Sequence, residues 1–107
     1  MAEIVLFVDV NFGGLHTHMY DTVADFRQLA LGGVGSGIGG DWNDVVSSLV
    51  VESGTWQAFR DINFSVPQGP HLVAGMKLNF VENVGIDNDS MSSILKLSDF
   101  PTRTILT

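Results

Sequence analysis

The sequence predicts an all-β sandwich, and three observations support that prediction. Short segments rich in β-branched and aromatic residues recur along the 107 residues, each bounded by Gly, Pro, Asn or Asp. The long amphipathic helical segments that a βαβ fold requires are missing from the sequence. Two six-residue patterns each occur twice in the same order, which indicates a fold made of two similar halves.

The expected elements follow in chain order. Residues 4–8 (IVLFV) form a β-branched, apolar first strand, and further strands are expected at residues 16–20, 49–51, 56–59, 71–73, 76–80 and 94–97. Residues 21–31 contain the one plausible helical turn, because apolar residues there have helical spacing. Trp56 is expected in the core, and Trp42 beneath the loop that it begins.

Composition limits the classes of function. The chain is 45% apolar and 16% charged, which is typical of a globular domain, and its net charge is −7. An acidic domain repels phosphate backbones and anionic lipids, so we expect neither nucleic acid nor a membrane as a partner. Cations are the natural counter-partners, although an acidic surface also serves solubility alone. The absence of cysteine excludes disulfides and thiolate metal sites and leaves the compartment open.

The two repeated patterns divide the chain into equivalent halves. F-x-D-[VI]-N-F occurs at residues 7–12 and 59–64, and N-D-x-x-S-S occurs at residues 43–48 and 88–93. The first half is longer and contains the glycine-rich run 32–40, which we interpret mostly as an insertion into a loop. The same order of patterns in both halves makes coincidence a poor explanation.

The N-D-x-x-S-S segments carry the donor atoms that calcium prefers. Calcium is a hard cation that takes roughly 6–8 oxygen ligands. Each segment supplies amide, carboxylate and hydroxyl oxygens within six residues. A single copy is typical of a turn or cap, whereas two copies brought together by pseudo-twofold symmetry favour shared metal sites.

These patterns resemble those of the microbial βγ-crystallin family. The paired segments are similar to its double-clamp calcium motif N/D-N/D-x-x-S/T-S, and residues 7–13 are similar to its Greek-key signature of an aromatic, four residues, an aromatic and Gly. The resemblance covers residues 4–97. It implies a βγ-crystallin-like sandwich of two Greek-key motifs in one domain, 1–107, with motifs over roughly 3–52 and 53–98 and a short tail at 99–107.

The resemblance also implies two Ca²⁺ ions and a ligand set for them. The implied ligands are the backbone carbonyls of Val8 and Arg60 and oxygens of Asn43, Asp44, Ser47, Asn88, Asp89 and Ser92. Ser47 and Ser92 would each reach the site of the opposite segment. Ser48 and Ser93 match a serine of the family that supports the fold without touching metal.

One departure from the family pattern predicts strain. Ser65 follows the second aromatic hexad where the family has a glycine, which commonly occupies a positive-φ corner. We therefore expect a cost on the order of 1 kcal/mol at Ser65. Each site would hold one or two carboxylates, which predicts modest calcium affinity, with Kd about 10⁻⁶ to 10⁻⁴ M.

Other signals are weaker. Residues 35–40 fit G-x-G-x-x-G but lack the strand before and the helix after that dinucleotide binding requires. His16 and His18 would share one face of a strand, with His71 as a distant third candidate for a zinc or copper site. Because no third ligand is defined, two solvent-facing histidines are the simpler interpretation.

The expected class is therefore a monomeric binding domain and not an enzyme, since no nucleophile elbow marks any serine. The alternative is an interaction module on the same fold, such as a protease inhibitor or carbohydrate-binding module, that uses the glycine-rich loop 32–40.

Overall fold

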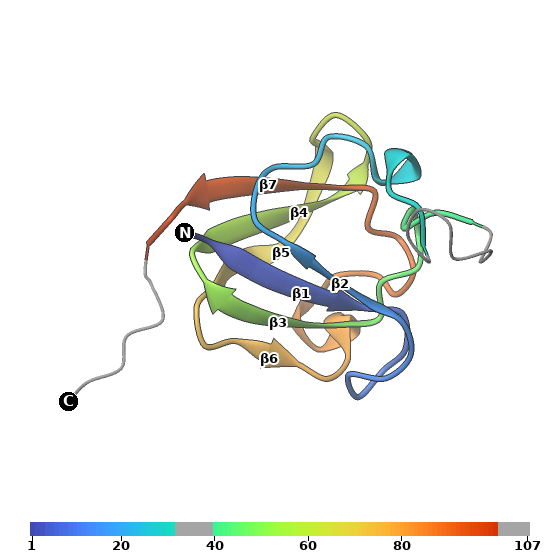
Figure 1. Cartoon of the computed structure of the whole chain (residues 1–107), viewed down its shortest axis with the longest axis horizontal. Coiled ribbons are helices and arrows are strands. Elements are labelled where there is room, and N and C mark those ends of the chain that lie inside the picture. Colours follow the sequence, from blue (N-terminus) through green and yellow to red (C-terminus); the bar gives the residue numbers. More distant parts are fainter. Residues whose placement is uncertain (32–39, 101–107) are drawn as a thin grey trace.

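The computed structural model describes residues 1–31 and 40–100, and within these ranges the chain forms two antiparallel β-sheets (Figure 1). The first sheet has the order β2-β1-β3-β6, and its strands are β1 (Glu3–Phe7), β2 (His16–Met19), β3 (Ser48–Ser53) and β6 (Lys77–Leu78). The second has the order β5-β4-β7, with β4 (Thr55–Asp61), β5 (Ser65–Val73) and β7 (Ser93–Ser98). The predicted all-β sandwich is confirmed.

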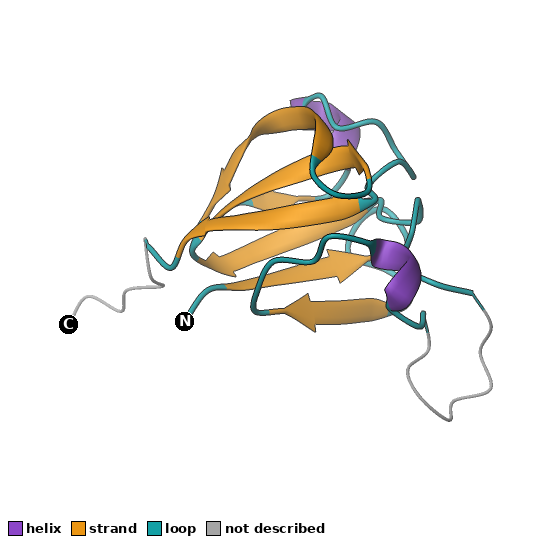
Figure 2. Ribbon diagram, turned by 90° about the horizontal axis from the view of Figure 1, so that it is seen from above, coloured by secondary structure: helices purple, strands orange, loops and turns teal. Residues whose placement is uncertain are grey.

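The helical content of the described residues is two short 3₁₀ turns in the connections outside the sheets, Phe26–Gln28 and Val81–Val84 (Figure 2). The first lies within the segment where a helical turn was expected. Asp25 begins it, because its carboxylate accepts a hydrogen bond from the Arg27 backbone amide at 3.0 Å. No helix in the described ranges is long and apolar enough to span a membrane.

The two halves interlock through strand exchange. β6 belongs to the second half but pairs with β3 of the first, with Leu78 opposite Leu49. In return, Val23 of the first half bridges Ile94 of β7, with backbone N···O distances of 2.9 Å in both directions. Each half therefore pairs with a strand of the other, which holds the two halves together at a common junction.

A hydrophobic core fills the space between the sheets. Ile4 and Leu6 alternate with outward-facing residues along β1 and are fully buried, as the period of a strand requires. Trp56 is fully buried, and its indole nitrogen donates to the Ser53 carbonyl at 3.0 Å. Trp56 lies in the core as predicted, and Trp42, which was expected beneath a loop, is also part of the core, with 2% exposure.

Most strands differ in length from their predictions, and β5 differs most. β5 covers nine residues, whereas the expected strand 71–73 began only after Pro70, and β5 contains both Pro67 and Pro70. Both prolines are tolerated since β5 is an edge strand, where a missing backbone donor can face solvent. β6 is shorter than expected, with only two paired residues.

The aromatic hexads form two matching corners. Their aromatic pairs meet edge to face, with ring centroids 5.7 Å apart for Phe7 and Phe12 and 5.6 Å apart for Phe59 and Phe64. In both corners the fifth and sixth residues have left-handed backbone conformation: Asn11 and Phe12, with φ of 57° and 60°, and Asn63 and Phe64, with the same values.

The prediction of backbone strain at Ser65 is wrong, because the strained position is the next residue. Ser65 is not among the described residues with positive φ; the next residue, Val66, is, with φ of 57°. Its counterpart in the first corner is Gly14, with φ of 74°. A β-branched residue is disfavoured there because its branched side chain crowds the backbone. The second corner therefore carries the strain at Val66, where the first corner has a glycine.

Val66→Gly is accordingly expected to stabilise the domain by about 1 kcal/mol, since relief of left-handed strain of about 1–2 kcal/mol exceeds the entropic cost of glycine. Val66 is half exposed, so little buried contact is lost. The measurement is urea unfolding of both proteins. Ser65→Gly is the control, and it should destabilise by about 0.5–1 kcal/mol because no strain is relieved there. Equal effects of the two substitutions would contradict this assignment.

Candidate metal centre

The two N-D-x-x-S-S segments, here the first clamp (43–48) and the second clamp (88–93), lie side by side at the junction of the halves. Backbone hydrogen bonds join them reciprocally: the Asp44 amide donates to the Met91 carbonyl at 3.0 Å, and the Asp89 amide donates to the Val46 carbonyl at 3.3 Å. Asp44 and Asp89 both have positive φ, of 59° and 57°. Aspartate tolerates this conformation, and it lets each clamp turn at the same residue.

Each clamp serine reaches the aspartate of the other clamp. The Ser92 hydroxyl donates to Asp44 Oδ1 at 3.0 Å, and the Ser47 hydroxyl donates to Asp89 Oδ1 at 3.1 Å. Both serines are buried, whereas both aspartates are exposed. Two oxygen clusters result, each containing atoms from both halves. We call the cluster of Asn43, Asp44 and Ser92 the first site, and that of Asn88, Asp89 and Ser47 the second site.

The neighbouring serines tie the clamps to the aromatic corners. The fully buried Ser48 hydroxyl donates to the Asp9 carbonyl at 2.6 Å and accepts from the Phe12 amide at 3.0 Å. Ser93 makes the equivalent pair of bonds in the second corner, to the Asp61 carbonyl and from the Phe64 amide. This agrees with a fold-supporting role for both serines.

Backbone bonds also fix the residues before Val8 and Arg60. The Ser47 amide donates to the Phe7 carbonyl at 2.9 Å, and the Ser92 amide donates to the Phe59 carbonyl at 3.0 Å. Val8 and Arg60 follow these bonded carbonyls directly, so each is positioned at the start of a corner beside a clamp serine. Arg60 lines the same pocket as the first site.

Two buried oxygens at equivalent positions lack partners. Asn43 Oδ1 and Asn88 Oδ1 are inaccessible to solvent and accept no hydrogen bond within the part of the chain that the structure describes. A buried acceptor left unsatisfied costs about 1–3 kcal/mol, so each one demands an explanation. Both belong to the first residue of a clamp, and a cation bound at each site would satisfy the oxygen there.

Carboxylates that sequence reasoning missed position these asparagines. The backbone amide of Asn43 donates to Asp41 Oδ1 at 2.9 Å, and the backbone amide of Asn88 donates to Glu82 Oε2 at 3.3 Å. The two acids are at different distances from their clamps in the sequence, so the repeat gives no signal for them. Their common role is visible only in the folded chain.

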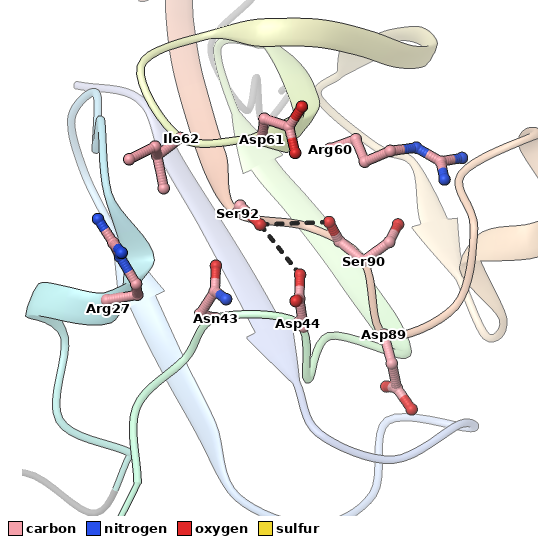
Figure 3. Close-up of a pocket in the computed structure, with 9 residues that line it drawn as sticks. All are labelled: Arg27, Asn43, Asp44, Arg60, Asp61, Ile62, Asp89, Ser90 and Ser92. Carbon is pink, nitrogen blue, oxygen red and sulfur yellow. Dashed lines mark hydrogen bonds between the residues drawn. The ribbon is translucent and has the colours of Figure 1, made fainter.

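The first site opens into a pocket of about 480 Å³. The side chains of Asn43 and Asp44 point in the same direction there and Ser92 contacts Asp44, whereas Asp89 points away from them (Figure 3). The pocket is lined by Arg27, Asn43, Asp44, Arg60, Asp61, Ile62, Asp89, Ser90 and Ser92. The lining is therefore rich in oxygen atoms that can bind a cation, and it also includes two arginines.

Both arginines are engaged by carboxylates outside the pocket lining. Arg27 Nη2 lies 2.8 Å from Asp25 Oδ2, and hydrogen bonds from Arg27 lower the pKa of the Asp25 carboxyl. Arg60 forms an ion pair with Asp87. Because each guanidinium is paired, neither presents an uncompensated positive charge to a cation at the first site.

The donor set distinguishes between kinds of metal. Within residues 1–31 and 40–100, no group of three or more His, Cys, Asp and Glu side chains is arranged to hold a metal. The clamps instead offer one carboxylate each, together with amide, hydroxyl and backbone oxygens. That set suits a hard cation such as Ca²⁺ and contains none of the nitrogen or sulfur ligands that borderline metals favour.

Two other predicted features lie away from the clamps. His16 and His18 are on β2, whereas His71 is on β5 of the other sheet, so the third histidine does not join the pair. Residues 32–39, most of the glycine-rich loop assigned to the alternative function, lie outside the described residues, as does most of the G-x-G-x-x-G match.

Comparison with known proteins shows the family to which this chain belongs. No protein-family model matches the chain. A protein of Ciona intestinalis named "Beta/gamma-crystallin" is 42% identical over 67 residues, which is 63% of this chain and 67% of the relative. The chain belongs to the βγ-crystallin family.

Solved βγ-crystallin structures agree with this assignment. A βγ-crystallin from Ciona intestinalis has a TM-score of 0.71 and 36% identity, covering 88% of this chain and 98% of that one. A βγ-crystallin from Methanosaeta thermophila, described as transition-metal-ion-binding, has a TM-score of 0.62 and 28% identity, covering 88% and 99%. The family resemblance and the βγ-crystallin fold are thus confirmed, while a microbial origin, calcium as the ion and a count of two sites stay predictions.

Proposed function

We propose that this βγ-crystallin domain binds two Ca²⁺ ions, one at each site between the clamps, and that ion binding sets the stability of the fold. The observation that carries the proposal is the pair of buried oxygens on Asn43 and Asn88 that accept no hydrogen bond from any residue within 1–31 and 40–100. The domain acts as a monomeric binding module without a catalytic role, and neither nucleic acid nor a membrane is its partner.

The ligands of each ion come from both halves of the domain. Asn43, Asp44 and Ser92 hold the first ion, together with the Arg60 carbonyl. The second site is built in the same way from Asn88, Asp89 and Ser47, with the Val8 carbonyl. The net charge of −7 favours cation uptake at both sites.

The choice of calcium rests on donor chemistry. The Methanosaeta thermophila relative is described as binding transition-metal ions. In this chain the clamps offer only oxygen atoms, most of them uncharged, and hard oxygen sites select Ca²⁺ over Ni²⁺, Cu²⁺ or Zn²⁺ through ligand type. With one clamp carboxylate per ion, the expected Kd is about 10⁻⁶ to 10⁻⁴ M.

Calcium binding should stabilise the fold because the sites exist only when the halves are joined. Asp44 and Ser92 are far apart in the sequence and meet through tertiary structure. An ion that binds only the folded chain contributes about 2.7 kcal/mol per site at a hundredfold excess over Kd.

The test is a calorimetric titration of chelator-treated protein with Ca²⁺, with a thermal melt at each end point. Two binding events per chain and a rise in melting temperature of roughly 10 °C or more are expected, since about 4–8 °C follows from each kcal/mol in a domain of this size. Mg²⁺ serves as the control and should produce a smaller shift, because it demands stricter octahedral geometry and dehydrates reluctantly. Absence of both heat and a shift in melting temperature would refute the proposal.

A further inference from the structure

A second set of metal-ligand side chains lies on the outer face of the first sheet, on strands β1 and β2. β2 is the edge strand of this sheet, with His18 opposite Val5 and His16 opposite Phe7. Met19 of β2 faces the core, so His16 and His18 share the outward face, and both are exposed. The clamps use neither histidine.

Glu3 determines which nitrogen of His18 is free. His18 Nδ1 lies 2.6 Å from Glu3 Oε2, at the start of β1. An ionised carboxylate can only accept a hydrogen bond, so Nδ1 carries the proton and Nε2 of the neutral ring keeps its lone pair. A carboxylate that holds one histidine nitrogen while the other binds metal is the usual outer support of a metal-ligating histidine.

The spacing of the two rings fits a shared ion. Their centroids are 5.4 Å apart, with an interplanar angle of 71°. Two imidazoles that bind one ion at about 2.0–2.1 Å with a near-tetrahedral angle have ring centroids roughly 5 Å apart. The distance between the rings is therefore compatible with two nitrogens that bind one ion.

Aromatic neighbours limit the motion of both rings. His16 packs against Phe7, with ring centroids 5.6 Å apart, and His18 is stacked near Tyr20, with centroids 6.5 Å apart and an interplanar angle of 13°. Such contacts lower the entropy lost when a ligand fixes the side chains. The pair is thus partly organised for binding while it remains open to solvent.

We propose that His16 and His18 chelate one borderline divalent transition-metal ion, of the Ni²⁺, Cu²⁺ or Zn²⁺ class, and that Glu3 is the positioning residue of this site. Neutral imidazole nitrogen is the ligand these ions favour and Ca²⁺ does not. Glu3 acts through His18 and not as a third ligand, and water occupies the remaining coordination positions. This site is independent of the calcium clamps, because it shares no residue with them.

The experiment is a Ni²⁺ titration of the full chain in saturating Ca²⁺, which keeps the clamp oxygens occupied. Calorimetry should give one Ni²⁺ per chain, and paramagnetic broadening in NMR spectra should begin at the ring signals of His16 and His18 while those of His71 remain sharp. His16→Gln and His18→Gln should each lower Ni²⁺ affinity at least tenfold, at the low end of the roughly 10–100-fold cost of losing even a supporting residue. His71→Gln is the matched control and should leave the affinity unchanged.

Glu3 is tested by a pair of variants. Glu3→Ala should weaken Ni²⁺ binding by roughly 10–100-fold, and Glu3→Gln should restore part of it, because its amide oxygen can still accept from His18 Nδ1. The calcium isotherm should be the same in both variants. Unchanged Ni²⁺ affinity in His16→Gln or His18→Gln, an equal loss in His71→Gln, or broadening that begins at the clamps would overturn the proposal, whatever the outcome at the calcium sites.

Discussion

Asp44→Gly is expected to abolish calcium binding at the first site and to leave the second site intact. Asp44 provides the only clamp carboxylate of the first site. Its loss should therefore lower the calcium affinity of that site by more than the roughly 10–100-fold cost of losing a residue that only supports a ligand. Glycine is chosen because Asp44 has φ of 59°, which alanine would strain. Calorimetry should then show one binding event where the parent shows two, and the calcium-induced stabilisation should fall by about 2.7 kcal/mol at a hundredfold excess.

Double-mutant cycles test whether the sites are shared as the hydrogen bonds indicate. Ser92→Ala should affect the same ion as Asp44→Gly, so the double variant should lose little more calcium binding than Asp44→Gly alone. Ser47→Ala should affect the other ion, so combining it with Asp44→Gly should impair both sites additively. Additivity in the first pair and coupling in the second would show that each clamp binds its ion without the other.

The sequence was most informative where it repeats. The two clamps and the two hexads share residue types at fixed spacing, and equivalent residues then make equivalent contacts in the structure. Ser48 and Ser93, for example, form the same pair of corner hydrogen bonds. A repeat constrains both copies at once, which is why the fold and the meeting of the clamps could be predicted from so short a chain.

Features that depend on one copy alone were missed or misplaced. The strain assigned to Ser65 lies at Val66, because backbone dihedral angles are set by the corner as a whole and not by one aligned residue. β5 continues through Pro67 and Pro70 because it is an edge strand, a position that sequence does not reveal. The contact of Glu3 with His18 likewise follows from the pairing of β1 with β2, which no local pattern specifies.

The two proposed kinds of metal site differ in how they relate to the fold. The clamps lie at the junction of the halves, so an ion there resists their separation and contributes to folding. The histidine pair lies on an outer face within one half, where both ligands come from a single strand. An ion bound there bridges no separate parts of the chain, so it should affect stability much less than calcium does.

Trp42→Ala is expected to cost about 3–5 kcal/mol of stability, as truncation of a buried aromatic residue does. Trp42 is 2% exposed and directly precedes Asn43, and its amide donates to the Leu29 carbonyl at 3.0 Å. Loss of the indole removes the anchor that places the first clamp, so calcium affinity at the first site should fall as well. Urea unfolding in chelator and calcium titration at a temperature where the variant is folded measure the two effects separately.

Trp56→Ala is the matched control, because it truncates an equally buried indole on β4 that is not adjacent in sequence to either clamp. It should lose a similar 3–5 kcal/mol and keep its calcium affinity. Saturating calcium should then restore about 2.7 kcal/mol per site at a hundredfold excess, more completely than in Trp42→Ala. Equal losses of calcium affinity in both variants would mean that the clamps depend on the core as a whole, and not on the residue that joins the first clamp to it.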